Sequence, residues 1–396
     1  MRSPAGWQAA PPAGRRSPEH ESPEPAGVGH RSKGVRTRAL VALSGGVDSA
    51  VAAALLIEQG YEVVAAMLQL WADRGPGGFE AAPDALTHAV PRARRVADWL
   101  GVPFHVVDAR AIFRRRVVDY FVAEYGVGRT PSPCVLCNRA VRFGTLLDLA
   151  RDLDAAFVAT GHFARVRQAG ARYQLLRGCD STKDQSYFLH TLSQDQLARV
   201  RFPLGRLTKA EVRAIASQRG LPVASQPDSQ DICFLAGSDY RRFLASQAPH
   251  LFQPGPIRDR SGHVLGQHRG LPAYTVGQRK GLGIAAPEPL YVLAIEPAEN
   301  ALVVGTADEL GQDECLVERL HYVSGEAAVV PFRAVVQIRY RACPVEATVT
   351  PLEGRVAHVR FASPQPGVTP GQFLVVYDGE VVLGGGVICR AQKSML

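Results

Sequence analysis

The sequence has no long hydrophobic run. A helix that crosses a membrane needs about 20 mainly apolar residues, and even the apolar segment at residues 40–53 is interrupted by Asp48. We therefore expect no membrane association. The chain is nevertheless 46% hydrophobic over 396 residues, which is enough to bury a large core and to divide into two or three domains.

The N-terminal residues lack the apolar core of a secretory signal. Residues 1–37 are rich in proline, glycine and charge, so we expect a disordered tail. The three glutamates of this tail are unlike a mitochondrial presequence. Residues 1–38 hold seven Lys and Arg against three Glu, which accounts for half of the net charge of +8. Evidence for nucleic-acid binding must therefore come from local clusters.

The seven cysteines do not fit a secreted disulfide framework, because the number is odd and the chain is long. We expect a reducing, cytoplasmic location. Only Cys134 and Cys137 are closely spaced, and a zinc site would normally need a second pair or histidines. The pair alone is compatible with half a zinc site, a dithiol or an accidental spacing.

The N-terminal half alternates strand-like and helix-like segments. Strand-like runs at residues 38–43 and 61–68 flank a helical segment at 48–59, and the alternation continues to about residue 160. The pattern predicts an α/β fold with a parallel sheet covered by helices. Residues 72–89 have no usable period and look like a mobile connection.

The pattern changes after residue 220. Thr208 and Glu211 form a capping box that opens a helix ending at Gly220, and short strands and glycine turns follow. From about residue 290, apolar residues alternate with period two, and Asp378-Gly379 predicts a hairpin. We expect a small central domain and a C-terminal antiparallel β-barrel. The predicted domains are residues 38–225, 226–298 and 299–396.

A bare glycine turn, SGGVDS, joins the first strand to the first helix at residues 44–49. Such a turn directs backbone N–H groups and the positive end of a helix dipole to one point, which predicts a phosphate site. The loop lacks the Gly-Lys-Ser/Thr ending of the common nucleotide loop and the three spaced glycines of a dinucleotide site. The alternative is a turn kept only for close strand–helix packing.

Two features near the cysteines bear on their chemistry. Arg139 and Arg142 follow the Cys134/Cys137 pair, and we expect them to lower a thiol pKa and favour a reactive thiolate. Cys233 stands between Ile232 and Phe234, where the residues alone favour a small buried apolar side chain.

The loop resembles the signature of the PP-loop ATP pyrophosphatases, which hold the β and γ phosphates as a unit. From about residue 38 to 388 the chain resembles the bacterial tRNA-specific 2-thiouridylases of the MnmA type. The matching stretches, in order, are SGGVDS, GRTPSPCVLCN, ATGHFAR, STKDQSYFL, DSQDICF, YTVGQRKGLG, IRYR and SPQPGVTPGQ.

The resemblance implies ATP-dependent 2-thiolation of the wobble uridine of tRNA. The C2 oxygen is adenylated, and sulfur arrives from a cysteine persulfide. Cys137 is the implied catalytic nucleophile, Cys233 the implied persulfide carrier, and the two are expected to form a transient disulfide. ATP with Mg²⁺ is the expected substrate, with no permanently bound cofactor or metal. The expected partners of the monomer are tRNA and a cysteine desulfurase or sulfur-relay protein.

The resemblance also assigns binding residues. The ATP contacts match Ala42, Leu43, Ser44, Gly45, Gly46, Val47, Asp48, Ser49, Met67 and Gly161. The segment that meets the target base matches Ser132, Pro133 and Cys134. The tRNA contacts match His162, Lys183, Asp184, Gln185, Arg339, Tyr340 and Gln372. Without the resemblance, Lys183-Asp184 is a surface pair and Arg339-Tyr340 are ordinary strand residues.

Three positions depart from the family pattern. Some relatives have an acid where this chain has Cys134, which leaves a role in proton transfer open. Ser132 stands where asparagine is usual, and Gln226 where many relatives have lysine. Two other hypotheses remain. A different PP-loop enzyme, which thiolates another RNA position or forms an amide, would lack Cys233. A non-catalytic RNA-binding protein would have lost the phosphate loop or a catalytic cysteine.

Overall fold

The computed structural model describes residues 36–71, 89–227, 232–235 and 239–392. The predictions for the N-terminal tail and for the connection at residues 72–89 fall almost entirely outside these ranges. In the part that the structure describes, no helix is both long enough and apolar enough to cross a membrane.

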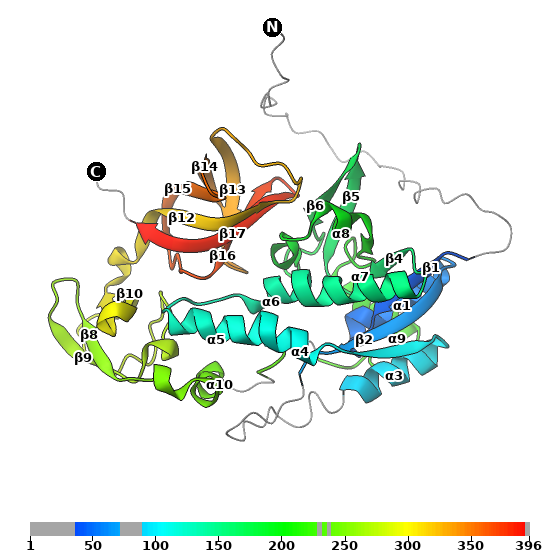
Figure 1. Cartoon of the computed structure of the whole chain (residues 1–396), viewed down its shortest axis with the longest axis horizontal. Helices are drawn as coiled ribbons and strands as arrows, with labels where there is room; N and C mark the ends of the chain where they lie inside the picture. Colours follow the sequence, from blue (N-terminus) through cyan, green and yellow to red (C-terminus); the bar gives the residue numbers. More distant parts are fainter. Residues whose placement is uncertain (1–35, 72–88, 228–231, 236–238, 393–396) are drawn as a thin grey trace, which may run out of the picture. The chain divides into compact units, whose positions relative to one another are not determined.

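A five-stranded sheet forms the N-terminal part, in the order β3-β2-β1-β4-β7. Figure 1 labels its strands β1, β2 and β4. Every pairing in it is parallel, as the alternation predicts. The chain adds β2 and β3 on one side of β1 and then β4 and β7 on the other side. Because the strands are parallel, their carboxyl ends lie at one edge of the sheet, where ligands bind in such folds. The strands are β1 (Arg38–Ala42), β2 (Glu62–Gln69), β3 (Phe104–Asp108), β4 (Phe157–Ala159) and β7 (Val200–Arg201).

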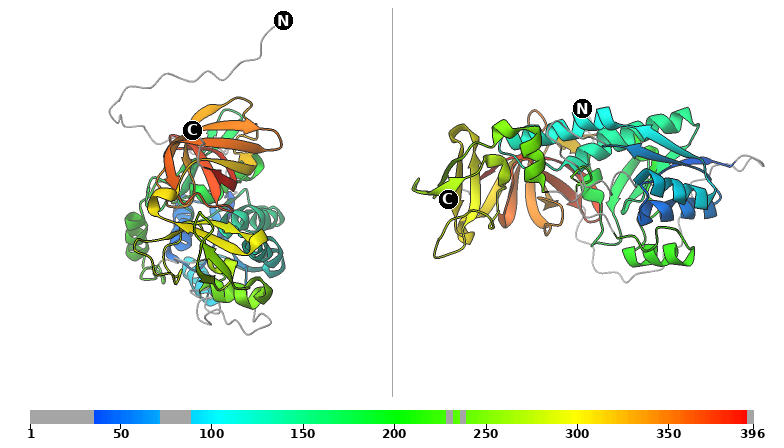
Figure 2. Two further views of the ribbon diagram at one scale, coloured as in Figure 1. Left: turned by 90° about the vertical axis from the view of Figure 1, so that its left-hand side faces the viewer. Right: turned by 90° about the horizontal axis from the view of Figure 1, so that it is seen from below.

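Helices cover both faces of this sheet, as the right-hand view of Figure 2 shows. On β2, Val64 and Ala66 pack in one apolar cluster with α7 (Phe143–Asp152), whereas Ala65 packs in another with α1 and α3. Alternate residues of a strand point to opposite faces, so the sheet is buried on both sides. The other helices are α1 (Val47–Glu58), α3 (Ala89–Leu100) and α9 (Lys209–Gln218).

Two helices contain a wider π turn. One runs through α4 (Arg110–Phe113), η1 (Arg114–Val118) and α5 (Asp119–Gly126). The other runs through α6 (Pro133–Leu136), η2 (Cys137–Arg142) and α7. Single π turns inside helices are frequent at functional sites. Here the π turn begins on Cys137.

The hairpin of β5 (Ala164–Ala169) and β6 (Arg172–Arg177) leaves the parallel sheet and joins the C-terminal strands through β17. The sequence pattern did not indicate this pairing. The capping box at Thr208 and Glu211 is present as predicted. The short elements are η3 (Ser186–Leu189), α8 (Gln194–Ala198), α10 (Tyr240–Gln247), η4 (Pro249–Leu251), η5 (Leu271–Ala273), η6 (Pro297–Glu299) and η7 (Ala307–Glu309).

A separate four-stranded sheet, in the order β10-β11-β8-β9, forms the central part. It packs on a small apolar core that includes Ile257, Val292 and Leu302. The sheet extends through β11 to Gly305, beyond the predicted boundary at residue 298. Its strands are β8 (Gly255–Arg258), β9 (Val264–His268), β10 (Tyr291–Glu296) and β11 (Ala301–Gly305).

The C-terminal strands form an antiparallel barrel in the order β12-β15-β14-β13-β16-β17, closed by pairing of β12 with β17. The predicted hairpin is present, with Gly379 at φ 54° between β16 and β17. The predicted fold class is therefore confirmed. The strands are β12 (Gly311–Tyr322), β13 (Phe332–Gln337), β14 (Val345–Leu352), β15 (Val356–Pro366), β16 (Phe373–Asp378) and β17 (Val381–Gln392).

Candidate active site

The loop at residues 44–49 is held by its own serines. Ser49 Oγ accepts a hydrogen bond from the Ser44 backbone N–H at 3.1 Å, contacts Ser44 Oγ at 3.1 Å, and donates to the Gly46 carbonyl. Gly46 caps α1 without any side-chain hydrogen bond. The first N–H groups of this helix are therefore not covered by a capping side chain, as an anion site requires.

Two glycines keep the loop in place. Gly45 has φ 76°, and a Cβ there would lie 3.0 Å from the Ala93 backbone nitrogen. A Cβ on Gly161 would lie 2.7 Å from the Asp48 carbonyl carbon. The structure thus brings Gly161 against the loop, as an ATP contact requires. Met67 lies in the C-terminal half of β2, next to Ala66, whose carbonyl accepts a hydrogen bond from the Leu43 N–H.

A lysine that the sequence analysis did not single out reaches the loop. Lys209 Nζ donates to Asp48 Oδ1 at 2.6 Å, and its side chain is 12% exposed. Lys209 is the first residue of α9, where a cation opposes the helix dipole. A lysine at this unfavourable position was the feature of the sequence that could have indicated a functional role for Lys209. The loop itself has no lysine, and Lys209 places a cation beside it.

The first thiols lie on the helix that contains η2. Pro133 and Cys134 are in its first turn after Ser132, and Cys137 begins the π turn. Cys134 is half-buried and Cys137 is buried. Asn138, next to Cys137, donates to the Phe188 carbonyl at 3.3 Å and ties this turn to η3.

Cys233 approaches the same place from a distant segment. Its neighbours Phe234 and Leu235 are buried in the cluster that also contains Cys137, with the Phe234 ring 5.3 Å from that of Phe121. Cys233 itself is exposed, so the reading of it as a buried apolar residue is wrong. The buried Phe234 side chain fixes this segment to the core, while the neighbouring residue Cys233 is exposed.

The three thiols are close enough to influence one another. Burial raises the pKa of Cys134 to about 11 and that of Cys233 to about 12, and the nearby Cys137 thiol raises both further. Burial also raises the pKa of Cys137. Cys233 is exposed as a whole residue, but the protein packed around its sulfur disfavours the thiolate. In this state, burial therefore favours the thiol over the thiolate at all three positions.

The expectation that Arg139 and Arg142 lower the thiol pKa is wrong in its net direction. Arg142 does act in the lowering sense on each of the three pKa values, but burial outweighs it. Burial removes water that would stabilise a thiolate. The extent of burial depends on the tertiary structure and cannot be inferred from the neighbouring residues in the sequence.

Arg142 is oriented by a buried histidine. Arg142 Nη1 donates to His162 Nε2 at 3.1 Å, and His162 Nδ1 lies 2.7 Å from Thr160 Oγ1. Burial and the Arg142 charge lower the pKa of His162 well below its usual value. The imidazole is therefore neutral, with its proton on Nδ1, because arginine can only donate.

The residues predicted to contact RNA fall into two groups. Arg339 is exposed, and Lys183 and Tyr340 are partly exposed. A small pocket is lined by Gln337, the last residue of β13, by Tyr340 in the turn that follows, and by Thr182. The structure thus brings the two predicted contact regions, far apart in sequence, to one place.

The other four predicted RNA contacts are engaged inside the protein. Asp184 is buried and accepts from Arg177, from the Gly178 N–H and from the N–H and hydroxyl of Ser186. The other three side chains also bind inside the protein: Gln185 accepts from the Phe163 N–H, Gln372 donates to the Thr130 carbonyl, and His162 contacts both Arg142 and Thr160.

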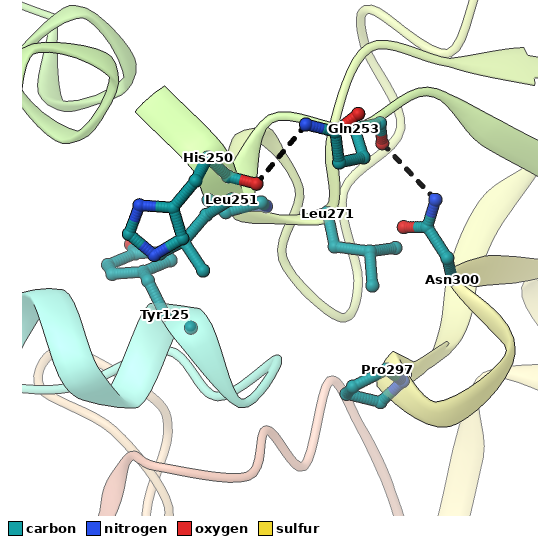
Figure 3. A pocket seen from close by; sticks show the side chains of 9 residues that line it. Tyr125, His250, Leu251, Gln253, Leu271, Pro297 and Asn300 are labelled. Atoms are coloured by element: carbon teal, nitrogen blue, oxygen red, sulfur yellow. Dashed lines mark hydrogen bonds between the residues drawn. The ribbon is translucent and has the colours of Figure 1, made fainter. Parts of the chain in front are cut away.

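A further cavity of about 290 Å³ lies away from the predicted site residues, beside the end of α5 (Figure 3). His250 and Tyr125 stand on one side of it and Pro297 and Asn300 on the other. Among the residues that the structure describes, no group of three or more His, Cys, Asp or Glu is arranged to hold a metal ion.

Family comparisons cover nearly all of the chain. Residues 37–237 match the tRNA methyl transferase HUP domain, 241–306 the tRNA methyl transferase PRC-barrel domain, and 312–388 the aminomethyltransferase beta-barrel domain. The chain is 49% identical to the tRNA-specific 2-thiouridylase MnmA of Heliobacterium modesticaldum, covering 89% of this chain and 92% of that one. It is 47% identical to that of Roseiflexus castenholzii, covering 89% and 99%.

Solved structures are more distant. A 4-thiouridine synthetase–RNA complex with bound ATP is 17% identical, with a TM-score of 0.34, and covers 54% of this chain and 50% of that one. A similarity of this size supports no conclusion about the site.

Proposed function

This chain belongs to the family of tRNA-specific 2-thiouridylases of the MnmA type, and from that premise we propose how its own residues carry out the reaction. As a member it is a tRNA-uridine 2-sulfurtransferase, which thiolates tRNA at the expense of ATP. The observation that carries the proposal is the packing of Cys137 in one buried cluster with Phe234 and Leu235, the residues that follow Cys233. In keeping with this packing, the Cys137 thiol raises the pKa of Cys233.

ATP binds at the loop of residues 44–49 with Mg²⁺ as part of the substrate. The uncovered N–H groups at the start of α1 hold the β and γ phosphates, and Gly161 permits the close approach of backbone to the loop. Lys209 supplies the cation that the loop lacks, by moving from Asp48 to the phosphates. The C2 oxygen of the uridine then attacks the α phosphorus, and pyrophosphate leaves.

Sulfur is delivered by Cys233. Its exposure suits collection of sulfane sulfur from a desulfurase or relay protein, which leaves a persulfide on Cys233. The terminal sulfur attacks C2 of the adenylated uridine. Cys137 then attacks Sγ of Cys233, and the S–S bond between Cys233 and the transferred sulfur breaks. The electron pair of that bond stays with the transferred sulfur and forms the C2=S double bond, while the C2–O bond breaks and AMP leaves. The resulting Cys137–Cys233 disulfide is returned to two thiols by a thiol reductant.

RNA binds across the loop that carries Lys183 and the end of β13. Lys183 and Arg339 face phosphates, and Tyr340, packed 4.4 Å from the Phe188 ring, offers a surface for a base. Three of the residues contribute indirectly. The side chains of Asp184 and Gln185 hold these loops by hydrogen bonds to backbone N–H groups, and the side chain of His162 orients Arg142. Ser132, Pro133 and Cys134 meet the target base. We propose that the monomer acts in the cytoplasm.

The test is nucleoside mass spectrometry of tRNA from a strain that lacks its own 2-thiouridylase. We expect the gene for this chain to restore 2-thiouridine derivatives, and a Cys233→Ser variant produced at the same level to restore none. Thiolation at a different nucleoside would instead indicate another PP-loop thiolase.

A further inference from the structure

Cys134 and Cys137 follow directly after a short segment that contacts both other parts of the fold. At Gly128, a Cβ would lie 2.7 Å from Pro297 of the central part. Arg129 Nη1 donates to Glu318 of the barrel at 2.8 Å. Thr130 Oγ1 donates to Thr275 Oγ1 of the central part at 3.2 Å. Residues 128–130 therefore form a joint between the catalytic helix and the C-terminal half.

The barrel holds this joint through one turn, residues 367–372, which connects β15 to β16. The Thr130 N–H donates to the Pro370 carbonyl at 2.8 Å, and Gln372 Nε2 donates to the Thr130 carbonyl at 2.8 Å. Both backbone polar groups of Thr130 thus bind the same turn. Gly371 has φ 92°, and a Cβ there would lie 2.8 Å from the Thr130 nitrogen. The turn and the joint are in backbone contact.

The connection from Thr130 to the thiols is stiff. Pro131 and Pro133 are both buried, and proline fixes its own φ and restricts the residue before it. A displacement of Thr130 is therefore passed on to Cys134 and to the start of the π turn at Cys137. A displacement of about 1 Å in a catalytic group is enough to cost about 100-fold in rate.

The same turn meets the RNA side of the barrel. At Gly367, its first residue, a Cβ would lie 3.6 Å from Arg339 Nη1. Arg339 is exposed and is one of the proposed phosphate contacts. One turn thus contacts an RNA-facing arginine at its start and the thiol segment at its end.

We propose that Gln372 is a positioning residue for the catalytic thiols, and that the turn of residues 367–372 couples RNA seating on the barrel to the alignment of Cys137. The proposal rests on the catalytic role of Cys137 stated above. Without the amide of Gln372, the Thr130 carbonyl loses its partner, the joint loosens, and Cys137 leaves its place beside Cys233.

The test compares Gln372→Ala and Gln372→Glu with the unchanged enzyme. The carboxylate keeps the shape of the side chain but cannot donate to a carbonyl. The control is Gln168→Ala, which removes a similar bond, to the Gly170 carbonyl at 3.2 Å, from an exposed hairpin. Four quantities are measured: the melting temperature, tRNA affinity, kcat, and the alkylation rate of Cys137 in the tryptic peptide of residues 130–139.

We expect both Gln372 variants to bind tRNA within about two-fold of the unchanged enzyme, to lose roughly 10- to 100-fold in kcat, and to alkylate faster at Cys137. The control should match the unchanged enzyme. Weaker tRNA binding with unchanged alkylation would make Gln372 an RNA contact and overturn the proposal, as would full activity of Gln372→Glu.

If Gln372→Ala does not fold, Gly371→Ala tests the same joint by pushing its new Cβ toward the Thr130 nitrogen. Faster alkylation of Cys137 is again expected, and an unchanged rate would contradict the coupling. A Cys137→Ser enzyme that thiolates at the normal rate would remove the catalytic premise instead. Because alkylation is measured without turnover, the two failures are distinguishable.

Discussion

The phosphate loop and the thiol site are built in opposite ways. The loop is one continuous segment, and its hydrogen bonds run between Ser44, Gly46 and Ser49. The thiol site joins Cys134 and Cys137 on one helix to Cys233 on a distant segment, and aromatic packing around Phe234 holds it together. The conformation of the loop is set within one segment, and Lys209 and Gly161 reach it from elsewhere. The thiol site, in contrast, forms only when two distant segments pack together.

The largest expected effect lies in the assembled site. Cys233→Ser should accept no sulfur-35 from a desulfurase and form no thiouridine, because a hydroxyl cannot carry a persulfide. Cys137→Ser should still be labelled on Cys233 but should stall before release. Cys134→Ser should retain substantial activity, because Cys134 is assigned neither the persulfide nor the attacking thiol and serine keeps a side chain of similar size beside the target base. Persistent thiolation by Cys233→Ser would remove the persulfide mechanism.

A pair of glycine variants separates ligand binding from folding in the loop. At Gly46 the backbone is extended, and the nearest atom to a Cβ is Ser44 Oγ at 3.6 Å. Gly46→Val should therefore lower pyrophosphate release about 100-fold, on the scale of losing one preorganised donor, without lowering the melting temperature.

Gly45→Ala should instead lower the melting temperature, because it combines a positive φ with a contact of 3.0 Å to the Ala93 nitrogen. Calorimetry and a pyrophosphate assay measure both variants. Equal melting temperatures for the two would contradict the structural distinction between these glycines.

Arg142 provides a smaller and pH-dependent effect. Its charge acts to lower the pKa of Cys137, so Arg142→Gln should raise that pKa and reduce the thiolate fraction at any given pH. The pH profile of Cys137 alkylation should move to higher pH, with a several-fold slower rate at neutral pH. Glutamine can still donate to His162, and Arg142→Lys restores the charge. A shift to lower pH would show that burial, not charge, controls the thiol.

The smallest expected effects concern RNA. Charge reversal at Lys183 or Arg339 should weaken tRNA binding and reduce the slope of log affinity against log salt by about one for each phosphate that is no longer neutralised. Reversal at Glu353, in an exposed turn of the barrel, is a suitable control. Unchanged affinity across several salt concentrations would return Lys183 and Arg339 to ordinary surface residues.

The features that the sequence predicted are those set by neighbouring residues. The strand–loop–helix at residues 44–49 and the hairpin at Gly379 each depend on local backbone preferences, and both are present. The structure also packs Cys137 in one cluster with Phe234 and Leu235, which follow Cys233, and resemblance rather than sequence spacing had suggested that the two cysteines act together.

The rest could not be predicted because it depends on tertiary packing. Burial sets the pKa of the thiols against the expectation from Arg139 and Arg142. In the sequence, Lys209 is simply the residue after a capping threonine, and only the fold places its side chain on Asp48. Gln372 binds the Thr130 carbonyl across two parts of the fold, and no local pattern indicates such a bond.

The most direct test of the central claim is a single-turnover reaction with enzyme that carries sulfur-35 on Cys233, unlabelled tRNA and ATP. The account predicts that label passes to C2 of the wobble uridine, with one AMP, one pyrophosphate and one Cys137–Cys233 disulfide formed for each thiouridine. Labelled thiouridine made without ATP, or made while Cys137 remains a free thiol, would contradict it.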